Sequence, residues 1–209
     1  MSAVRRDLIR FTALAMSITI TLALFGTALG AVPDITKEEQ ALLPNYCKYV
    51  QLTKGYGSEQ SKRWAAVYGE AFIHLHHYCY ALVYLMKAVQ YSTPPEMRRF
   101  YLSTAFSEIQ YVVERIPDDH MLRPELLTKQ AMILRRLNKP KEAVDLLNQV
   151  VQLDPKYWRA YYELAESYVA LKDKKKAREV LEEGLGQVPD ARLLTATLKD
   201  LEGESRANK

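Results

Sequence analysis

The sequence predicts an all-α protein in which antiparallel helix pairs stack into a short α-solenoid. Residues 123–191 repeat with a period of 34, and each copy carries apolar and small residues at the three- and four-residue spacings of a helix face. A proline closes each copy, at Pro155 and Pro189. Apolar residues make up 48% of the 209 residues and charged residues 26%, which fits a globular protein and excludes a disordered, collagen-like or polytopic membrane protein.

The first thirty residues have the layout of a secretory signal peptide. A basic start that ends at Arg10 precedes an uncharged apolar run over residues 11–25, and the small residues Ala28 and Gly30 offer a cleavage site. Residues 1–30 are therefore expected to export the protein, by the general or the twin-arginine route, so that it is periplasmic or secreted. The alternative is an uncleaved anchor in the inner membrane that leaves the rest of the chain facing the periplasm.

Two cysteines, Cys47 and Cys79, are the only ones in the chain. Export implies an oxidising compartment, so they are expected to form a disulfide. Cys79 recurs with apolar residues at helical spacing, which indicates that it points inward. The bridge would close a loop of about thirty residues and stabilise the fold by about 3 kcal/mol. Two free, buried thiols are the alternative.

Residues 31–122 are predicted to form a tyrosine-rich helical region. Ten of the fourteen tyrosines lie between Tyr46 and Tyr111. A short helix is expected over about 38–43, and a long one over about 69–91. The inward face of the long helix and of the segment before it is expected to contain Trp64, Tyr68, Phe72, Leu75, Cys79, Leu82, Met86 and Val89.

This region also contains a degenerate copy of the repeat. Ala81 and Ala105 occupy the small-residue positions of its first and second helix, but they lie 24 positions apart instead of 12. The turn around residues 92–96 is therefore expected to carry about twelve extra residues.

The regular copies are assigned to residues 123–157 and 158–191. Within each copy, one alanine in the first helix and one in the second are expected to let the two helices approach closely. These alanines are Ala131 and Ala143 in one copy and Ala165 and Ala177 in the other. A capping helix is expected over residues 190–202, followed by a flexible tail at 203–209.

This arrangement resembles the tetratricopeptide repeat family, whose pattern is W-x2-L-G-x2-Y, then A-x3-F, then P, over 34 residues. Tyr161 stands in the place of the Trp, Ala165 in that of the Gly and Leu181 in that of the Phe. The resemblance covers about residues 124–189. It implies a concave groove, lined by the first helix of each pair, that takes a peptide or a helix of a partner protein.

The resemblance also implies which residues face this groove. They are Glu125, Thr128, Met132, Arg135 and Arg136 in one copy and Arg159, Tyr162, Glu166 and Val169 in the next. For Arg135 and Arg136 the alternative is a solvated helix end, where cations suit the helix dipole.

A histidine cluster supports a rival hypothesis. His74, His76, His77 and Cys79 are close enough along one helix to suggest a protein that handles a metal ion or haem. Against this, the H-E-x-x-H pattern is absent and no further ligands are evident. Packing residues with satisfied hydrogen bonds, or a tyrosine-rich ligand pocket, are the alternatives.

No enzyme motif is present: the chain lacks a G-x-S-x-G elbow, a phosphate loop and a dinucleotide fingerprint. The segment 118–120, Asp-Asp-His, follows Pro117 in a turn between repeats, where an Asp is expected to cap the next helix rather than to act as an acid–base group. The net charge of +4 is too small to indicate nucleic-acid binding. The sequence thus predicts a non-enzymatic adaptor or scaffold of the bacterial cell envelope that binds another protein and holds no cofactor.

Overall fold

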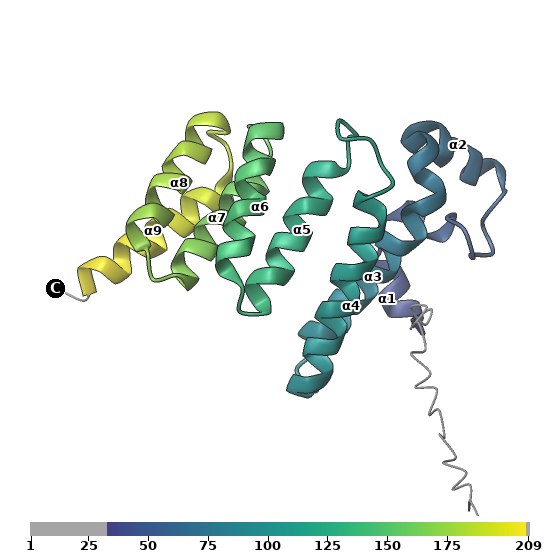
Figure 1. Ribbon diagram of the computed structural model, residues 1–209, viewed down its shortest axis with the longest axis horizontal. Coiled ribbons are helices and arrows are strands. Elements are labelled where there is room, and N and C mark those ends of the chain that lie inside the picture. Colours follow the sequence, from purple (N-terminus) through teal and green to yellow (C-terminus); the bar gives the residue numbers. More distant parts are fainter. Residues whose placement is uncertain (1–32, 208–209) are drawn as a thin grey trace, which may run out of the picture.

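The computed structural model describes residues 33–207, in which every regular element is a helix (Figure 1). The elements are α1 (Lys37–Leu42), η1 (Asn45–Lys48), α2 (Glu59–Tyr68), η2 (Gly69–His74), α3 (Leu75–Val89), α4 (Pro95–Val113), α5 (Arg123–Arg136), α6 (Pro140–Leu153), α7 (Trp158–Ala170), α8 (Lys174–Gln187) and α9 (Arg192–Ala207). The elements η1 and η2 are short 3₁₀ helices. The expected signal peptide, residues 1–30, lies outside this part of the chain. Within it, no helix combines the length and the apolar character that crossing a membrane requires.

The two regular copies fold as the antiparallel pairs α5–α6 and α7–α8, so the predicted all-α architecture is confirmed. Ala131, Ala143, Ala165 and Ala177 are all fully buried. Because these side chains are small, the helix axes can approach closely, and larger neighbours such as Leu181 fill the space beside them.

Both pairs turn in the same way. Asn138 and Lys172, which are 34 positions apart, each have a φ of 63° and end the first helix of their pair. The backbone N–H of Lys139 then donates to the carbonyl of Leu134, and the equivalent bond recurs in the second copy. The repeat in the sequence is therefore a repeat of local backbone geometry as well as of side-chain size.

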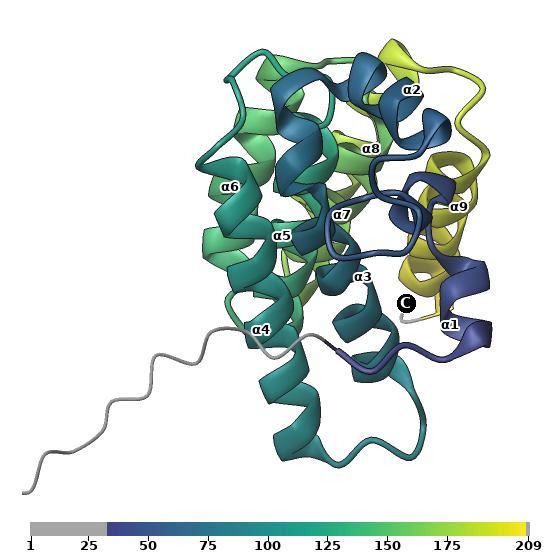
Figure 2. The same cartoon turned by 90° about the vertical axis from the view of Figure 1, so that its right-hand side faces the viewer.

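The degenerate pair is α3–α4, and here the expected long turn is wrong. α4 begins at Pro95, directly after a turn at residues 90–94, so the additional residues between Ala81 and Ala105 lengthen the two helices instead. Proline fits the first position of a helix because its missing N–H would have no partner there. The hairpin consequently projects beyond the α5–α6 turn (Figures 1 and 2).

Before α3, the chain is not the continuous helix that the apolar spacing suggests. Gly69, with a φ of 58°, ends α2, and η2 separates α2 from α3. Trp64 and Tyr68 therefore reach the core from a different helix than Cys79 does. The expectation that Val89 faces inward is also wrong, since 61% of its surface is exposed.

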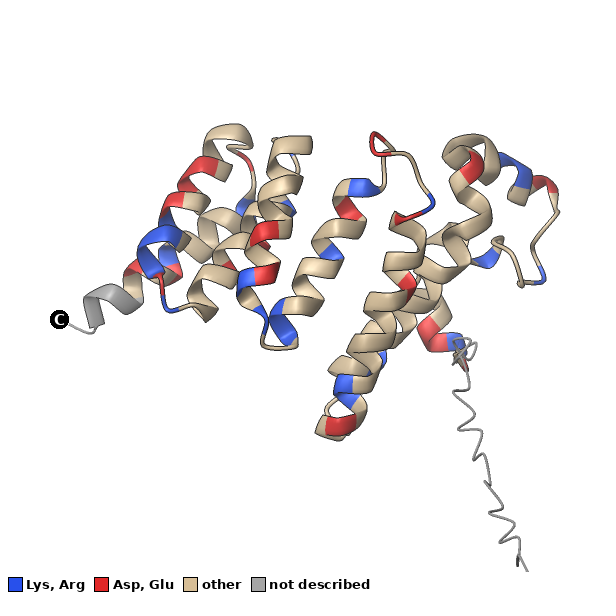
Figure 3. Ribbon diagram, viewed as in Figure 1, with Lys and Arg blue, Asp and Glu red and all other residues tan. Residues whose placement is uncertain are grey.

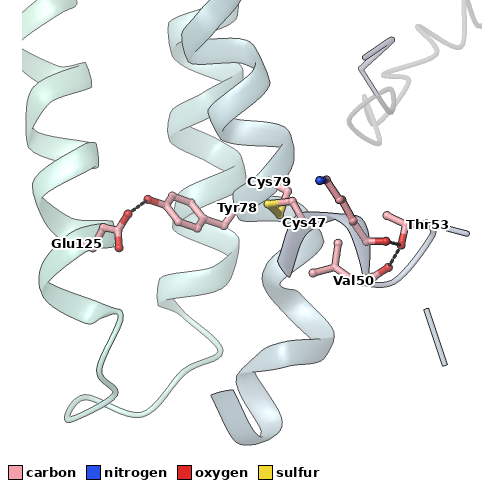
Figure 4. The surroundings of a disulfide bond; sticks show 7 residues. Cys47, Val50, Thr53, Tyr78, Cys79 and Glu125 are labelled. Carbon is pink, nitrogen blue, oxygen red and sulfur yellow. Dashed lines mark hydrogen bonds between the residues drawn. A yellow bond between two sulfur atoms is a disulfide. The ribbon is translucent and has the colours of Figure 1, made fainter. Parts of the chain in front are cut away.

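The predicted disulfide between Cys47 and Cys79 is present, with the two Cα atoms 5.7 Å apart (Figure 4). It joins η1 to α3, and both cysteines are buried. Next to it, the ring of Tyr46 packs edge-on against Trp64 and Tyr68, at centroid distances of 5.9 and 5.1 Å. The disulfide and this aromatic cluster hold the N-terminal segment of the described chain against the first helix pair.

The last helix, α9, packs on α7 and α8 and covers the end of the stack. Its Leu194 is fully buried in a cluster with Tyr161. The helix continues to Ala207, so residues 203–207 of the expected tail are helical. No proline interrupts this stretch, and the single Gly203 costs only about 1 kcal/mol of helix propensity.

Two glycines in α8 provide a matched test of this packing. A Cβ at Gly184 would lie 2.7 Å from Tyr161 Cγ and 2.9 Å from Leu194 Cδ1, whereas one at Gly186 would meet nothing within 4 Å. Gly186→Ala is therefore expected to stabilise the protein by about 0.5–1 kcal/mol through helix propensity. Gly184→Ala is expected to destabilise it by about 1–3 kcal/mol, because α8 must then shift away from Tyr161 of α7 and Leu194 of α9. Urea unfolding of the two variants checks the opposite signs, and equal stabilisation would contradict the close packing.

Candidate functional site

A cavity of about 190 Å³ opens between the first helices of the two regular pairs. It is lined by Glu125, Thr128, Lys129 and Met132 from α5, by Tyr157, Trp158, Arg159, Tyr162 and Glu163 at the start of α7, and by Leu193 from α9. We refer to it as the α5–α7 cavity. Five of the nine groove residues implied by the sequence line it, namely Glu125, Thr128, Met132, Arg159 and Tyr162.

The walls of the α5–α7 cavity combine aromatic rings with one unsatisfied hydroxyl. The Arg159 guanidinium lies over the Trp158 ring, 4.6 Å from its centroid, which helps to fix the indole in place. On the opposite wall, Thr128 Oγ1 is buried and has no hydrogen-bond partner within residues 33–207. A buried hydroxyl without a partner costs free energy.

Glu125 connects the cavity with the tyrosine-rich half of the chain. The hydroxyl of Tyr78, a fully buried side chain of α3, donates to Glu125 Oε1 at 2.5 Å (Figure 4). Burial, reinforced by the charge of Glu125, raises the pKa of Tyr78 and of Tyr46 well above the ordinary value of a phenol. The same two causes raise the pKa of Tyr157 to about 12. Part of the tyrosine excess is thus arranged around one acidic side chain of the cavity.

The remaining predicted groove residues have other surroundings. Arg135 pairs with Glu163 at 2.7 Å and with Glu166 at 3.5 Å, so it bridges α5 and α7 beside the cavity. Val169 is half-buried and packs against the α7–α9 core. Arg136 is exposed and lines two shallow hollows next to the α3–α4 hairpin, outside the α5–α7 cavity. It is the last residue of α5, whereas the cavity is lined by residues 125–132 of that helix.

The sequence did not indicate half of the cavity lining. Lys129, Tyr157, Trp158, Glu163 and Leu193 line the cavity in addition to the expected positions. The adjacent aromatic residues Tyr157 and Trp158, at the boundary between the two copies, could have indicated a binding site, because large aromatic residues are enriched in recognition sites. The repeat pattern contains no information about Leu193, because this residue belongs to α9, which lies beyond the two regular copies.

The histidine cluster is a packing and hydrogen-bonding feature in the structure. Cys79 is not available as a metal ligand because its sulfur is bonded to Cys47. His77 Nδ1 contacts Glu108 Oε2 at 2.5 Å, and His76 Nδ1 bonds to the carbonyl of Ile73 at 3.0 Å. In the part of the chain that the structure describes, no three His, Cys, Asp or Glu residues are grouped so that they could hold a metal ion.

The pKa values of His74 and His76 are lowered, as expected for histidines that are packed and partly buried. Burial lowers the pKa of His76, and the neighbouring His77 lowers it further. Burial also lowers the pKa of His74, together with the positive charge of Arg115. Arg115 in turn lies over the ring of Tyr111, which packs against His74 and His77. The rings thus form one packed layer between α3 and α4.

The Asp118-Asp119-His120 segment is the turn before α5. Asp118 pairs with Arg123 at 2.8 Å, at the first residue of that helix. His120 Nδ1 accepts from the backbone N–H of Leu122 at 3.2 Å, and its Nε2 bonds to the carbonyl of Tyr68. The expected aspartate cap is wrong, however, since Leu122 is the residue before α5 and no side chain caps the helix. The contacts of Asp118 and His120 fix the turn instead.

Comparison with known proteins gives a family and a fold. Residues 134–199 match the tetratricopeptide repeat family, while no curated protein matches the sequence. Among solved structures, the chain is similar to a tetratricopeptide repeat protein of Thermus thermophilus, with 17% identity and a TM-score of 0.55 over 68% of this chain and 70% of that one.

A second solved structure with similarity is the first tetratricopeptide repeat domain of Spaghetti (RPAP3) bound to the HSP90 peptide SRMEEVD. The identity is 23% and the TM-score 0.45, over 60% of this chain and 95% of that one. The likeness to the Thermus protein supports the fold of stacked helix pairs, and the family match falls on helices α6, α7 and α8 with their flanks. Residues 134–199 of this chain are therefore similar to the tetratricopeptide repeat family, and the stacked helix pairs have its fold.

Proposed function

We propose that the protein is a non-enzymatic adaptor of the bacterial cell envelope that binds a peptide segment of a partner protein in the α5–α7 cavity. The observation that carries the proposal is the cavity itself. It lies between the first helices of two pairs that resemble tetratricopeptide repeats, a family that usually mediates protein–protein contacts. Its walls combine the aromatic Tyr157, Trp158 and Tyr162 with the apolar Met132 and Leu193.

The size of the cavity favours one anchoring side chain. Its volume of about 190 Å³ is smaller than the roughly 300–1,000 Å³ of sites for small organic ligands. An apolar or aromatic side chain of the partner would be enclosed by Met132, Tyr162 and Leu193. Interfaces obtain most of their free energy from a few such buried anchors, so one well-filled cavity can carry the affinity.

The polar groups of the lining favour a peptide over a strongly charged ligand. Glu125 and Lys129 on α5 and Arg159 on α7 bring both signs of charge to the edge of the cavity. Glu163 is already paired with Arg135. These mixed charges can bond to the backbone amides and carbonyls and to the polar side chains of the bound segment.

The envelope location rests on two observations of different kinds. The N-terminal sequence has the basic start, the uncharged run and the small residues of an export signal. The Cys47–Cys79 disulfide is a bond that persists in oxidising compartments and is rare in the cytosol. Cell fractionation that recovers the protein with the periplasm or the inner membrane would support this location, and recovery with the cytosol would contradict it.

A pair of methionine variants tests the binding site. Peptides selected from a random displayed library against the full chain are the probe. Met132→Glu places a charge on the cavity wall and is expected to weaken binding of the selected peptides at least tenfold. Met121→Glu makes the same change on the α4–α5 turn, where 67% of the side chain is exposed, and is expected to leave the affinity unchanged. Equal affinities of the two variants, or a failure of the library to yield any binder, would contradict the proposal.

A further inference from the structure

Charge is distributed unevenly between the two edges of the solenoid. The turns within the helix pairs, at residues 87–99, 135–142 and 172–176, contain eleven Lys or Arg and three Asp or Glu. The turns between successive pairs, at residues 114–123, 152–159 and 186–192, contain five of each. Turns within pairs lie at one edge of an antiparallel stack and turns between pairs at the other, and Figure 3 shows the basic residues gathered along the first of these. We refer to it as the basic edge.

The projecting α3–α4 hairpin adds apolar side chains to the basic edge. Tyr91 at its tip is fully exposed, and Phe100 is 55% exposed. Arg98 and Arg99 are exposed between Phe100 and the tip, on the first turns of α4. A tip that offers aromatic rings together with arginines resembles the residue pattern at the boundary between membrane headgroups and acyl chains.

The described chain also begins beside this hairpin. The Lys87 ammonium donates to the backbone carbonyl of Asp34 at 2.6 Å, which ties the start of the described residues to the end of α3. In the sequence, the uncharged run of residues 11–25 comes shortly before this point. In the sequence, an uncharged apolar segment therefore precedes the residues that are tied to the basic edge.

We propose that the basic edge, led by the tip of the α3–α4 hairpin, docks on an anionic phospholipid surface. Tyr91 and Phe100 insert at the headgroup boundary, while Arg98, Arg99 and Arg136 contact lipid phosphates. This orientation leaves the α5–α7 cavity free, since none of these residues lines it. The proposal is independent of peptide binding, because a protein without a partner in the cavity would dock in the same way.

Site-specific fluorescence on the full chain tests the docking. Tyr91→Cys and Met121→Cys each provide one thiol for an environment-sensitive fluorophore, because Cys47 and Cys79 are joined in the disulfide. The two positions are exposed and lie at opposite edges. Mixed phosphatidylglycerol–phosphatidylcholine vesicles are expected to shift the emission of the label at position 91 to the blue and to leave that at position 121 unchanged. Pure phosphatidylcholine vesicles are expected to have a smaller effect at position 91.

Charge reversal separates docking by the basic edge from attachment through the N-terminal run. Arg98→Glu/Arg99→Glu is expected to reduce the response at position 91 about tenfold or more in vesicle titrations. Lys156→Glu/Arg192→Glu makes the same change in net charge at exposed residues of the turns between pairs, away from the basic edge, and is expected to keep the response. Circular dichroism spectra of all variants check that they keep their helices.

Three results would overturn the proposal. Vesicles that bind the chain without any change at position 91 would show attachment by another part. Equal responses at positions 91 and 121 would show adsorption without orientation. A response at position 91 to an oligonucleotide or to a partner protein, but not to anionic vesicles, would assign the basic edge to a different class of macromolecule.

Discussion

Removal of the disulfide, by Cys47→Ala/Cys79→Ala, is expected to lower the free energy of unfolding by about 2–5 kcal/mol. The bridge joins residues 32 positions apart and connects η1 with the first full helix of the stack. Without it, the N-terminal segment is held by the packing of Tyr46 against Trp64 and Tyr68 and by its other contacts with α3. Alanine is chosen over serine because both positions are buried and a lone hydroxyl would add its own cost.

Urea unfolding with and without dithiothreitol checks this expectation. The reductant should bring the wild-type protein down to the stability of the double variant and leave the variant unchanged. Hydrogen exchange should place the lost protection mainly in η1 and α2, with α5 to α8 little affected. A wild-type stability that does not respond to reductant under denaturing conditions would contradict the role of the disulfide.

Alkaline pH is expected to destabilise the fold through its buried tyrosines. Burial and the charge of Glu125 raise the pKa of Tyr46, Tyr78 and Tyr157 in the folded state, for Tyr157 to about 12. In the unfolded chain the same phenols ionise near pH 10, so above that pH the unfolded state binds fewer protons than the folded state. The free energy of unfolding should therefore be unaffected by these groups below pH 10. Above it, the free energy should fall by up to about 1.4 kcal/mol per pH unit for each of Tyr46 and Tyr78.

Tyrosinate absorbance and helix content, followed together during an alkaline titration, measure this effect. Part of the absorbance change should appear only as the helix signal is lost. Tyr46→Phe/Tyr78→Phe should flatten the dependence of stability on pH above pH 10, although the loss of the bond from Tyr78 to Glu125 lowers stability at neutral pH by about 1–3 kcal/mol. Tyr91→Phe is the control, since its side chain is fully exposed and its removal should leave the slope unchanged. A slope that is equal in all three proteins would contradict the prediction.

The regular half of the fold could be predicted because its sequence repeats. Ala131 and Ala165 recur at a fixed period, and such small residues are found where helices cross closely. Asn138 and Lys172 also occupy equivalent positions of the repeat, and both end the first helix of their pair with a φ of 63°. The disulfide was predictable for a different reason, because a chain with two cysteines allows only one pairing within it.

The N-terminal half could not be predicted in the same detail, because its helices are set by single residues. Gly69 ends α2 in a left-handed conformation, although the apolar spacing continues across it. The sequence predicts Pro95 within a turn, whereas Pro95 starts α4 and lengthens the hairpin.

The candidate site needed the tertiary structure. Tyr78 meets Glu125 across 47 residues of sequence, and periodicity within one helix contains no information about such a pair. Leu193 joins the α5–α7 cavity from α9, beyond both repeats. By contrast, Thr128, Met132 and Tyr162 line the cavity as the family resemblance implied, because their positions follow from the repeat alone.

Photocrosslinking in the cells that produce the protein tests most directly whether the α5–α7 cavity receives a partner. A photoreactive phenylalanine analogue replaces Tyr162 in the cavity or the exposed Met121 on the α4–α5 turn, which does not line the cavity, and covalent adducts are identified by mass spectrometry. The account predicts a discrete adduct from position 162, formed with one segment of another protein and reduced by Met132→Glu, and none of that kind from position 121. An adduct pattern that is the same from both positions, or a partner captured only from position 121, would contradict it.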